Sequence, residues 1–126
     1  MTIRVEFDGS ELRSLSRHLS NSAKRLEPQL EDLLERHANA VAVTARQLAP
    51  KDRPWLSTEE GIRVERRDPL TRTIISPRDP EDQSVGYRVE YGTSDTAPQP
   101  FLGPAAKSGS SGFQRDALAL LVRNTL

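Results

Sequence analysis

The sequence contains no cysteine among its 126 residues, which excludes disulfides, thiolate metal sites and cysteine nucleophiles. Aromatic residues make up only 5% and hydrophobic residues 35% of the chain, and both values are low for a globular domain. Net charge is lacking as well, because 18 basic residues balance 18 acidic ones. A neutral balance argues against a dedicated binder of nucleic acids or membrane surfaces, since such proteins normally carry excess positive charge.

Long apolar runs are also missing from the sequence. No stretch approaches the ~20 apolar residues that span a bilayer, and the first residues lack the apolar core of a signal peptide. We therefore expect a protein that is made in a cytoplasm and has no membrane segment. The length suits one domain, residues 1–126, with a modest core. Nine prolines and seven glycines predict long irregular connections.

Motifs of catalysis and cofactor binding do not occur. The sequence has no glycine-rich phosphate loop, no GxGxxG pattern and no Gly-x-Ser-x-Gly nucleophile turn. The two histidines, His18 and His37, lack the helical pairing with His or Glu that zinc sites use. We expect His37 to be packed and hydrogen-bonded on a helix and His18 to lie at the surface of the helix that precedes it. The acidic loop 79–82 lacks the ligand spacing of a calcium loop. We expect no catalytic residues, no metal, no cofactor and no enzymatic activity.

Periodicity predicts an α+β domain that begins with a strand and a long helical segment. Apolar and polar residues alternate over 2–7, which is typical of a half-buried strand. Apolar residues then recur three and four apart over 12–48, which predicts a helical face. Because proline disturbs a helix interior, Pro28 indicates either two helices or one kinked helix, with the second part covering about 28–48.

The second half of the sequence predicts a sheet, two irregular arms and a closing helix. Three segments have strand-like patterns: 62–65, 70–76 and 85–91. We expect them to form an antiparallel meander, so that the sheet has three or four strands. The arms cover about 50–60 and 92–112, and the Ser-Gly-rich stretch 108–112 is typical of a flexible linker. Apolar spacing predicts the last helix over 113–124.

The densest basic cluster consists of Arg63, Arg66 and Arg67. In a regular strand, Arg63 and Arg67 project from one face and Arg66 from the other. One interpretation is a solvated sheet face whose charge is offset by Glu65 and Asp68. The alternative is a nucleic-acid-binding surface, either in an independent module or lining a ring through which DNA passes. No stacking aromatics accompany the arginines.

Two segments carry a resemblance to a known family. Val89–Thr93 reads Val-Glu-Tyr-Gly-Thr and Pro100–Ala105 reads Pro-Phe-Leu-Gly-Pro-Ala, and both follow the Leu-Ala-Pro of Leu48–Pro50. In this order and spacing, the chain from about Leu30 onward resembles the neck and tail-completion proteins of siphophages, also described as head–tail joining proteins. The sequence departs from that family's pattern in two places. Lys51–Ser57 replaces a Thr-Gly-x-Leu-like turn, and the Ser-Gly-rich stretch interrupts the final helix.

The resemblance implies a structural virion subunit that forms a ring, most simply a hexamer, around the DNA channel where tail and head meet. Its implied partners are other copies of itself and the neighbouring neck and tail proteins, namely a head–tail stopper or adaptor, the tail terminator and the tail tube protein. Non-specific contact with genomic DNA in the channel is a further expectation, and no membrane is involved. The expected location is the virion tail or neck, with the host cytoplasm during assembly.

Physical reasons support a structural role for the residues that carry the resemblance. Gly92 can leave an element at a backbone angle that other residues avoid. Pro98 and Pro100 keep the next segment extended and cannot donate to a strand ladder. Phe101 can pin that segment in an apolar pocket, and Pro104 suits the first turn of a helix. These features fit internal packing of the domain as well as a contact between subunits.

The candidate site residues follow from this resemblance. We expect subunit-interface anchors among Trp55, Tyr91, Gly92, Pro100, Phe101, Leu102 and Pro104. We expect any DNA-facing residues to be Arg63, Arg66 and Arg67. The two irregular arms are the segments expected to reach a neighbouring subunit and to become ordered on assembly. Within them we expect Phe101, Leu102 and Trp55 to be the main anchors, because buried aromatic side chains tend to dominate interface energetics.

Overall fold

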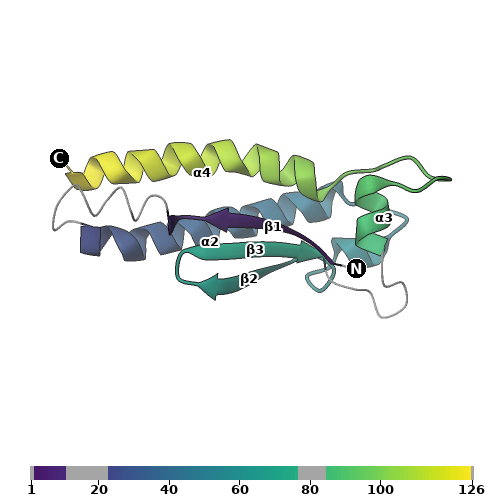
Figure 1. The fold of residues 1–126 in the computed structure, drawn as a ribbon, viewed down its shortest axis with the longest axis horizontal. Coiled ribbons are helices and arrows are strands. Elements are labelled where there is room, and N and C mark those ends of the chain that lie inside the picture. The colour runs from purple at the N-terminus through teal and green to yellow at the C-terminus, as the bar shows by residue number, and fades with distance from the viewer. Residues whose placement is uncertain (1, 11–22, 77–84, 126) are drawn as a thin grey trace.

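The computed structural model describes residues 2–10, 23–76 and 85–125 (Figure 1). It confirms a mixed α+β chain with an N-terminal strand, a long helix, a three-stranded sheet and a C-terminal helix. The elements in order are β1 (Ile3–Asp8), α2 (Ala23–Leu48), the 3-10 helix η1 (Pro54–Ser57), β2 (Arg63–Asp68), β3 (Thr71–Ser76), α3 (Val85–Tyr91) and α4 (Leu102–Thr125). The expectations for His18 and for the acidic loop 79–82 lie outside the described residues.

The sheet has the order β1-β3-β2, and both pairs are antiparallel. Val5, Ile74 and Val64 lie side by side in its register. On this face the central strand packs against α2, so the alternation over 2–7 reflects a real strand with one buried side. The N-terminal strand thus pairs with a strand about 70 residues later in the chain.

The segment 85–91 is a helix, α3, and the expected fourth strand is wrong. Its alternating residues also satisfy helical spacing, because Tyr87 and Tyr91 are four apart and their rings lie 4.9 Å apart. Both edges of β3 are already occupied by β1 and β2, so no edge of the central strand is left for this segment. Gly86 allows α3 to approach the end of β3, since a Cβ there would lie 2.5 Å from the Oγ of Ser76.

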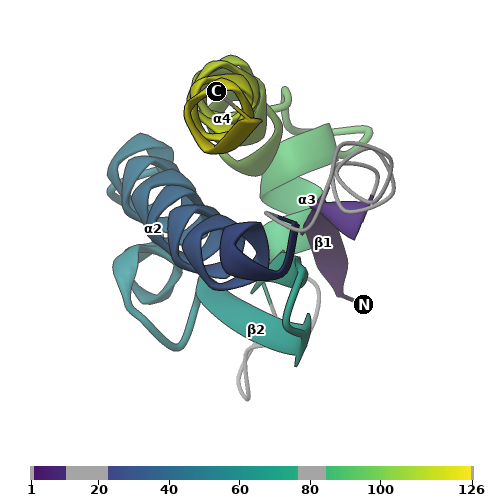
Figure 2. The same cartoon turned by 90° about the vertical axis from the view of Figure 1, so that its left-hand side faces the viewer.

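The long helix α2 continues through Pro28, which lies in its first turns and is exposed. Of the two alternatives, the described residues therefore show one helix across the proline. Helix α4 lies alongside α2, as the end-on view shows (Figure 2), and it also contacts β1. None of the helices in the described ranges is long and apolar enough to cross a bilayer.

The Ser-Gly-rich stretch 108–112 is part of α4, so the predicted linker is wrong and the second irregular arm shortens to about 92–101. The small residues serve close packing of the two long helices. A Cβ at Gly109 would lie 2.2 Å from Cγ2 of Val41 on α2. Tertiary contact thus outweighs the poor helix propensity of glycine and serine.

A buried arginine joins the sheet to α2. Arg72 on β3 is only 2% exposed, and its guanidinium contacts the carboxylates of Glu35 and Glu31 on α2. It also donates to the backbone carbonyl of Asp68 at 3.0 Å. The hydrogen bond from Arg72 is the main cause that lowers the pKa of Glu35. A buried charge of this kind requires such partners.

Candidate subunit interface

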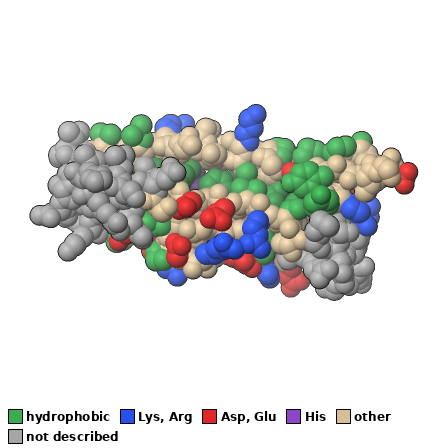
Figure 3. All heavy atoms as spheres, in the orientation of Figure 1, with side chains coloured by type: hydrophobic (Ala, Val, Ile, Leu, Met, Phe, Trp, Pro, Cys, Tyr) green, Lys and Arg blue, Asp and Glu red, His purple; other side chains and the backbone are tan. Residues whose placement is uncertain are grey.

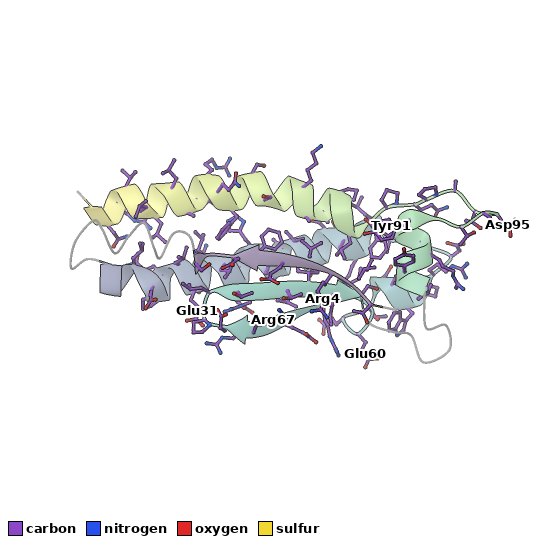
Figure 4. All side chains as sticks on the ribbon, in the orientation of Figure 1. Arg4, Glu31, Glu60, Arg67, Tyr91 and Asp95 are labelled. Atoms are coloured by element: carbon purple, nitrogen blue, oxygen red, sulfur yellow. The ribbon has the colours of Figure 1, made fainter. Side chains whose placement is uncertain are left out.

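The connection between α3 and α4 forms a projection that we call the finger, residues 93–100. All of its residues are exposed. It extends beyond one end of the helices, with Asp95 near its tip (Figure 4). This part of the chain offers surface that the domain does not use for its own core.

Hydrogen bonds hold the finger in one shape. The N–H groups of Asp95 and Thr96 donate to Oγ1 of Thr93 at 3.3 and 3.1 Å, and the N–H of Thr93 donates to the carbonyl of Thr96 at 2.9 Å. At its base, the N–H of Gln99 donates to the carbonyl of Val89 at 2.8 Å. All of these hydrogen bonds lie within one chain, so they define the shape of the finger without a partner.

Gly92 makes the turn from α3 into the finger. Its φ is +77°, a backbone conformation that glycine adopts without strain. An added Cβ would also lie 2.8 Å from the nitrogen of Pro98. The expectation that Gly92 leaves its element at an unusual backbone angle is confirmed, although that element is a helix and not a strand.

A buried carboxylate connects the two segments that carry the family resemblance. Glu90 on α3 accepts hydrogen bonds from the N–H groups of Phe101 (2.8 Å), Leu102 (3.0 Å) and Gly103 (2.8 Å). These groups belong to the N-terminus of α4, where N–H groups lack partners within the helix and where negative charge is favourable. A Cβ at Gly103 would lie 2.9 Å from Oε1 of Glu90, so glycine fits this contact closely.

Glu90 was not among the residues expected to matter. The available signal was that α4 has no acidic residue in its first turn, while a glutamate precedes the helix in the same motif. Sequence alone does not show that the chain turns back and brings that glutamate to the helix end.

The expected interface anchors divide between core and surface. Phe101 is 0% exposed, and Leu102 is buried beside it in the core of this same chain. Tyr91 is 61% exposed, and Pro100 and Pro104 are exposed as well. Phe101 and Leu102 therefore anchor the base of the finger within one subunit and present no side-chain surface to another.

Trp55 comes from a separate element. It lies on η1, is half-buried and packs against the core of the chain. The first predicted arm, about 50–60, is thus partly a short 3-10 helix whose Leu56 is fully buried. This arm is more closely tied to the domain than its composition indicated.

Each arginine of the predicted basic cluster contacts a carboxylate. Arg63 lies 3.2 Å from Glu65, and Arg66 lies 3.1 Å from Glu31 on α2. Arg67 lies 3.8 Å from Glu6 on β1. All three arginines are exposed, and acidic and basic side chains are intermixed over the sheet (Figure 3). The surface around them is mixed in charge and not a basic patch.

A second surface feature is a groove of about 760 Å³ between β1 and α4, which we call the β1–α4 groove. Apolar and polar residues line it: Val5, Glu6, Phe7, Asp8, Ala106, Lys107, Ser110, Phe113, Gln114, Ala117 and Leu118. The rings of Phe7 and Phe113 meet edge to face, with centroids 6.5 Å apart. Figure 3 shows hydrophobic side chains between α4 and β1 on this side of the molecule.

His37 and Asp116 connect the two long helices. The Nε2 of His37 lies 2.9 Å from Oδ2 of Asp116, and its ring meets Phe113 edge to face at 5.7 Å. This confirms the expected packed, hydrogen-bonded histidine. The hydrogen bond with His37 is the main cause that lowers the pKa of Asp116.

The fold and this surface define an α+β protein in which two long helices and a small sheet carry a projecting finger and a separate groove lined by apolar and polar residues. Within residues 2–10, 23–76 and 85–125, no three His, Asp or Glu side chains gather where they could hold a metal ion. Comparisons with models of known protein families, with curated proteins and with solved structures find no match for this chain.

Proposed function

We propose that this protein is a structural virion subunit of a siphophage-like bacteriophage and forms a ring at the neck or tail-completion position. The observation that carries the proposal is the link through Glu90. It joins Val89–Thr93 to Pro100–Ala105, the two segments that resemble the neck and tail-completion family. Their residues belong to one structural unit, so their order and spacing have a common physical cause.

This structural unit forms the exposed finger and holds its base in place. Glu90 fixes the start of α4, Gly92 turns the chain, and Phe101 anchors the return in the core. A domain that holds a polar loop out from its body in this way gains little for its own core. We infer that the finger serves contact with another protein chain.

The proposed role requires surfaces that bind other subunits, and it requires no chemical reaction. A cyclic ring requires two different surfaces on each subunit that fit each other in a head-to-tail manner. The finger and the β1–α4 groove lie on different parts of the chain and offer two such surfaces. We therefore propose a non-enzymatic, homo-oligomeric function without metal or cofactor, with six copies as the simplest number and other neck and tail proteins as neighbours.

The nucleic-acid-binding alternative receives less support. Arg63, Arg66 and Arg67 all have carboxylates within 4 Å, which reduces the positive field that phosphate binding requires. Contact between these arginines and DNA in the channel of a ring remains a prediction.

Cryo-electron microscopy of the neck of the virion that carries this chain tests the proposal. The expected result is a closed ring between portal and tail tube whose density fits β1, the sheet, α2 and α4. A well-resolved neck without this chain would overturn the proposal. Salt-dependent binding of DNA to the purified protein would then favour the nucleic-acid alternative.

A further inference from the structure

We propose that the finger of one copy docks into the β1–α4 groove of the neighbouring copy. This inference rests on the proposed ring and names the contact that builds it. It commits to a second copy of this chain as the occupant of the groove.

The groove has the features of a docking surface. Its floor contains the edge-to-face rings of Phe7 and Phe113, while Leu118 on its rim is 58% exposed. Among the described strands, β1 pairs only with β3. Its other edge borders the groove, and an open strand edge beside an apolar surface readily accepts another segment of chain.

The finger suits an aromatic-lined groove. Pro98 and Pro100 restrict its returning half to extended backbone, and the hydrogen bonds around Thr93 hold its tip. Proline-containing extended segments bind aromatic grooves because little conformational entropy is lost on docking. A preordered finger therefore binds at a lower entropic cost than a flexible loop.

The finger and the α4 rim of the groove each carry a single charge, and the two charges are of opposite sign. Asp95 is the sole charged residue of the finger, and Lys107 lies on the rim of the groove. Both are exposed, and neither forms an ion pair with a residue of the described ranges. On the opposite rim, Glu6 contacts Arg67 at 3.8 Å, and Asp8 accepts the N–H of Ser10 at 2.8 Å. Glu6 and Asp8 keep their negative charges, so the contact that charge favours is the one that brings Asp95 beside Lys107 on the α4 side of the groove.

The placement of the two surfaces makes their contact intermolecular. The finger extends away from the body beyond the start of α4, whereas the groove runs along the side of α4 from Ala106 to Leu118 (Figure 1, Figure 4). The tip at Asp95 points away from its own groove. Each copy therefore offers its finger to one neighbour and its groove to another, which is the head-to-tail arrangement that closes a ring.

Disulfide trapping tests the contact directly, because the chain contains no cysteine of its own. We expect the double variant Asp95→Cys/Gln114→Cys to give a ladder of covalent oligomers under mild oxidation, both in the purified protein and in assembled virions. The matched control is Asp95→Cys/Glu59→Cys, since Glu59 is exposed and does not line the groove. Equal ladders from both pairs, or no ladder from the first pair, would overturn the docking.

A second pair of variants tests the rim of the groove without disturbing the core. Leu118→Arg should weaken self-association about tenfold or more, the loss expected for an anchor side chain at an interface. The control is Val43→Arg, because Val43 is also an exposed aliphatic residue on a helix (47%) and does not line the groove. Equal association of both variants, measured by sedimentation equilibrium with circular dichroism as the check on folding, would refute the contact.

Failure of the docking and failure of the proposed function give different results. A ring in the virion neck without the Asp95→Cys/Gln114→Cys crosslink leaves the function standing and refutes the docking. A crosslinked ladder from purified protein without a ring in the neck supports the docking and refutes the virion role. If another segment of the same chain covered the groove instead, Leu118→Arg would lower the melting temperature without changing association, which also refutes the docking.

Discussion

Replacing Glu90 with alanine should destabilise the protein more than the loss of one surface charge. The carboxylate accepts three backbone N–H groups at 2.8–3.0 Å and is buried at 8% exposure. A hydrogen bond to a charged group contributes about 1.5–3 kcal/mol, and a buried donor without a partner is costly. Because the three bonds share one side chain and do not add, we expect a loss of about 3 kcal/mol in the free energy of unfolding.

Urea unfolding measures this loss. Trp55 is the sole tryptophan and packs against the core, so its fluorescence should report the transition. With a slope of roughly 1.5 kcal/mol per molar urea, a loss of about 3 kcal/mol lowers the midpoint by about 2 M. The urea midpoint of Glu90→Gln should lie between those of the wild type and Glu90→Ala, because the amide keeps one acceptor oxygen but turns an NH2 group toward a backbone N–H.

The control for this prediction is Glu59→Ala, since Glu59 is an exposed residue and its loss should change stability by less than about 0.5 kcal/mol. Faster hydrogen exchange at the amides of Phe101 and Gly103 should accompany Glu90→Ala. A Glu90→Ala midpoint equal to that of the control would refute the view that this carboxylate fixes the start of α4.

Three further predictions concern the packing of the helices and the turn into the finger. Gly109→Ala should destabilise the protein by about 1–3 kcal/mol, because its Cβ would lie 2.2 Å from a side chain of α2. At Gly112 the added Cβ would have its nearest neighbour at 3.6 Å, so Gly112→Ala should stabilise the protein by about 0.5–1 kcal/mol through helix propensity. Equal effects of the two substitutions on urea unfolding would contradict this packing. The lowered pKa of Asp116 stabilises the folded state above the unfolded pKa of about 3.8, and this contribution disappears as pH falls through the lower folded value. Below pH 4 the melting temperature of Asp116→Asn should therefore fall less than that of the wild type. Parallel curves of melting temperature against pH would show that the Asp116 carboxylate contributes nothing to this pH dependence. Gly92→Ala should cost at least about 1 kcal/mol, since φ is +77°; an unchanged urea midpoint would argue against the left-handed turn.

The sequence by itself determined the elements whose patterns are unambiguous. Alternation over 2–7 could be satisfied only by a strand with one buried face, and the structure has β1 there. Apolar spacing over the second part of the long segment, about 28–48, predicted α2 because many turns repeat the same face. The α+β class followed from these patterns together with the strands near 62–65 and 70–76.

Tertiary structure decided the segments whose local patterns fit two conformations. A seven-residue segment such as 85–91 carries apolar residues at both strand and helix spacing, and in the folded chain it is the helix α3, whose Gly86 packs closely against Ser76 at the end of β3. The glycines and serines of 108–112 favour a linker in isolation, but in the folded chain they allow α4 to approach Val41 on α2. In each case the free energy of packing against a distant element exceeded a weak local preference.

The candidate interface shows the same division. The motif from Val89 to Ala105 indicated where the important residues lie, and Gly92 was correctly assigned to a backbone turn. The role of Glu90 could not be predicted, and neither could the choice between a pocket of the same chain and a neighbouring subunit for Phe101, because each depends on a contact made after the chain has turned back on itself. The sequence shows which side chains can be buried or can accept a hydrogen bond. The folded domain decides which of them are buried or bonded within the chain, and therefore which surface is left for a partner.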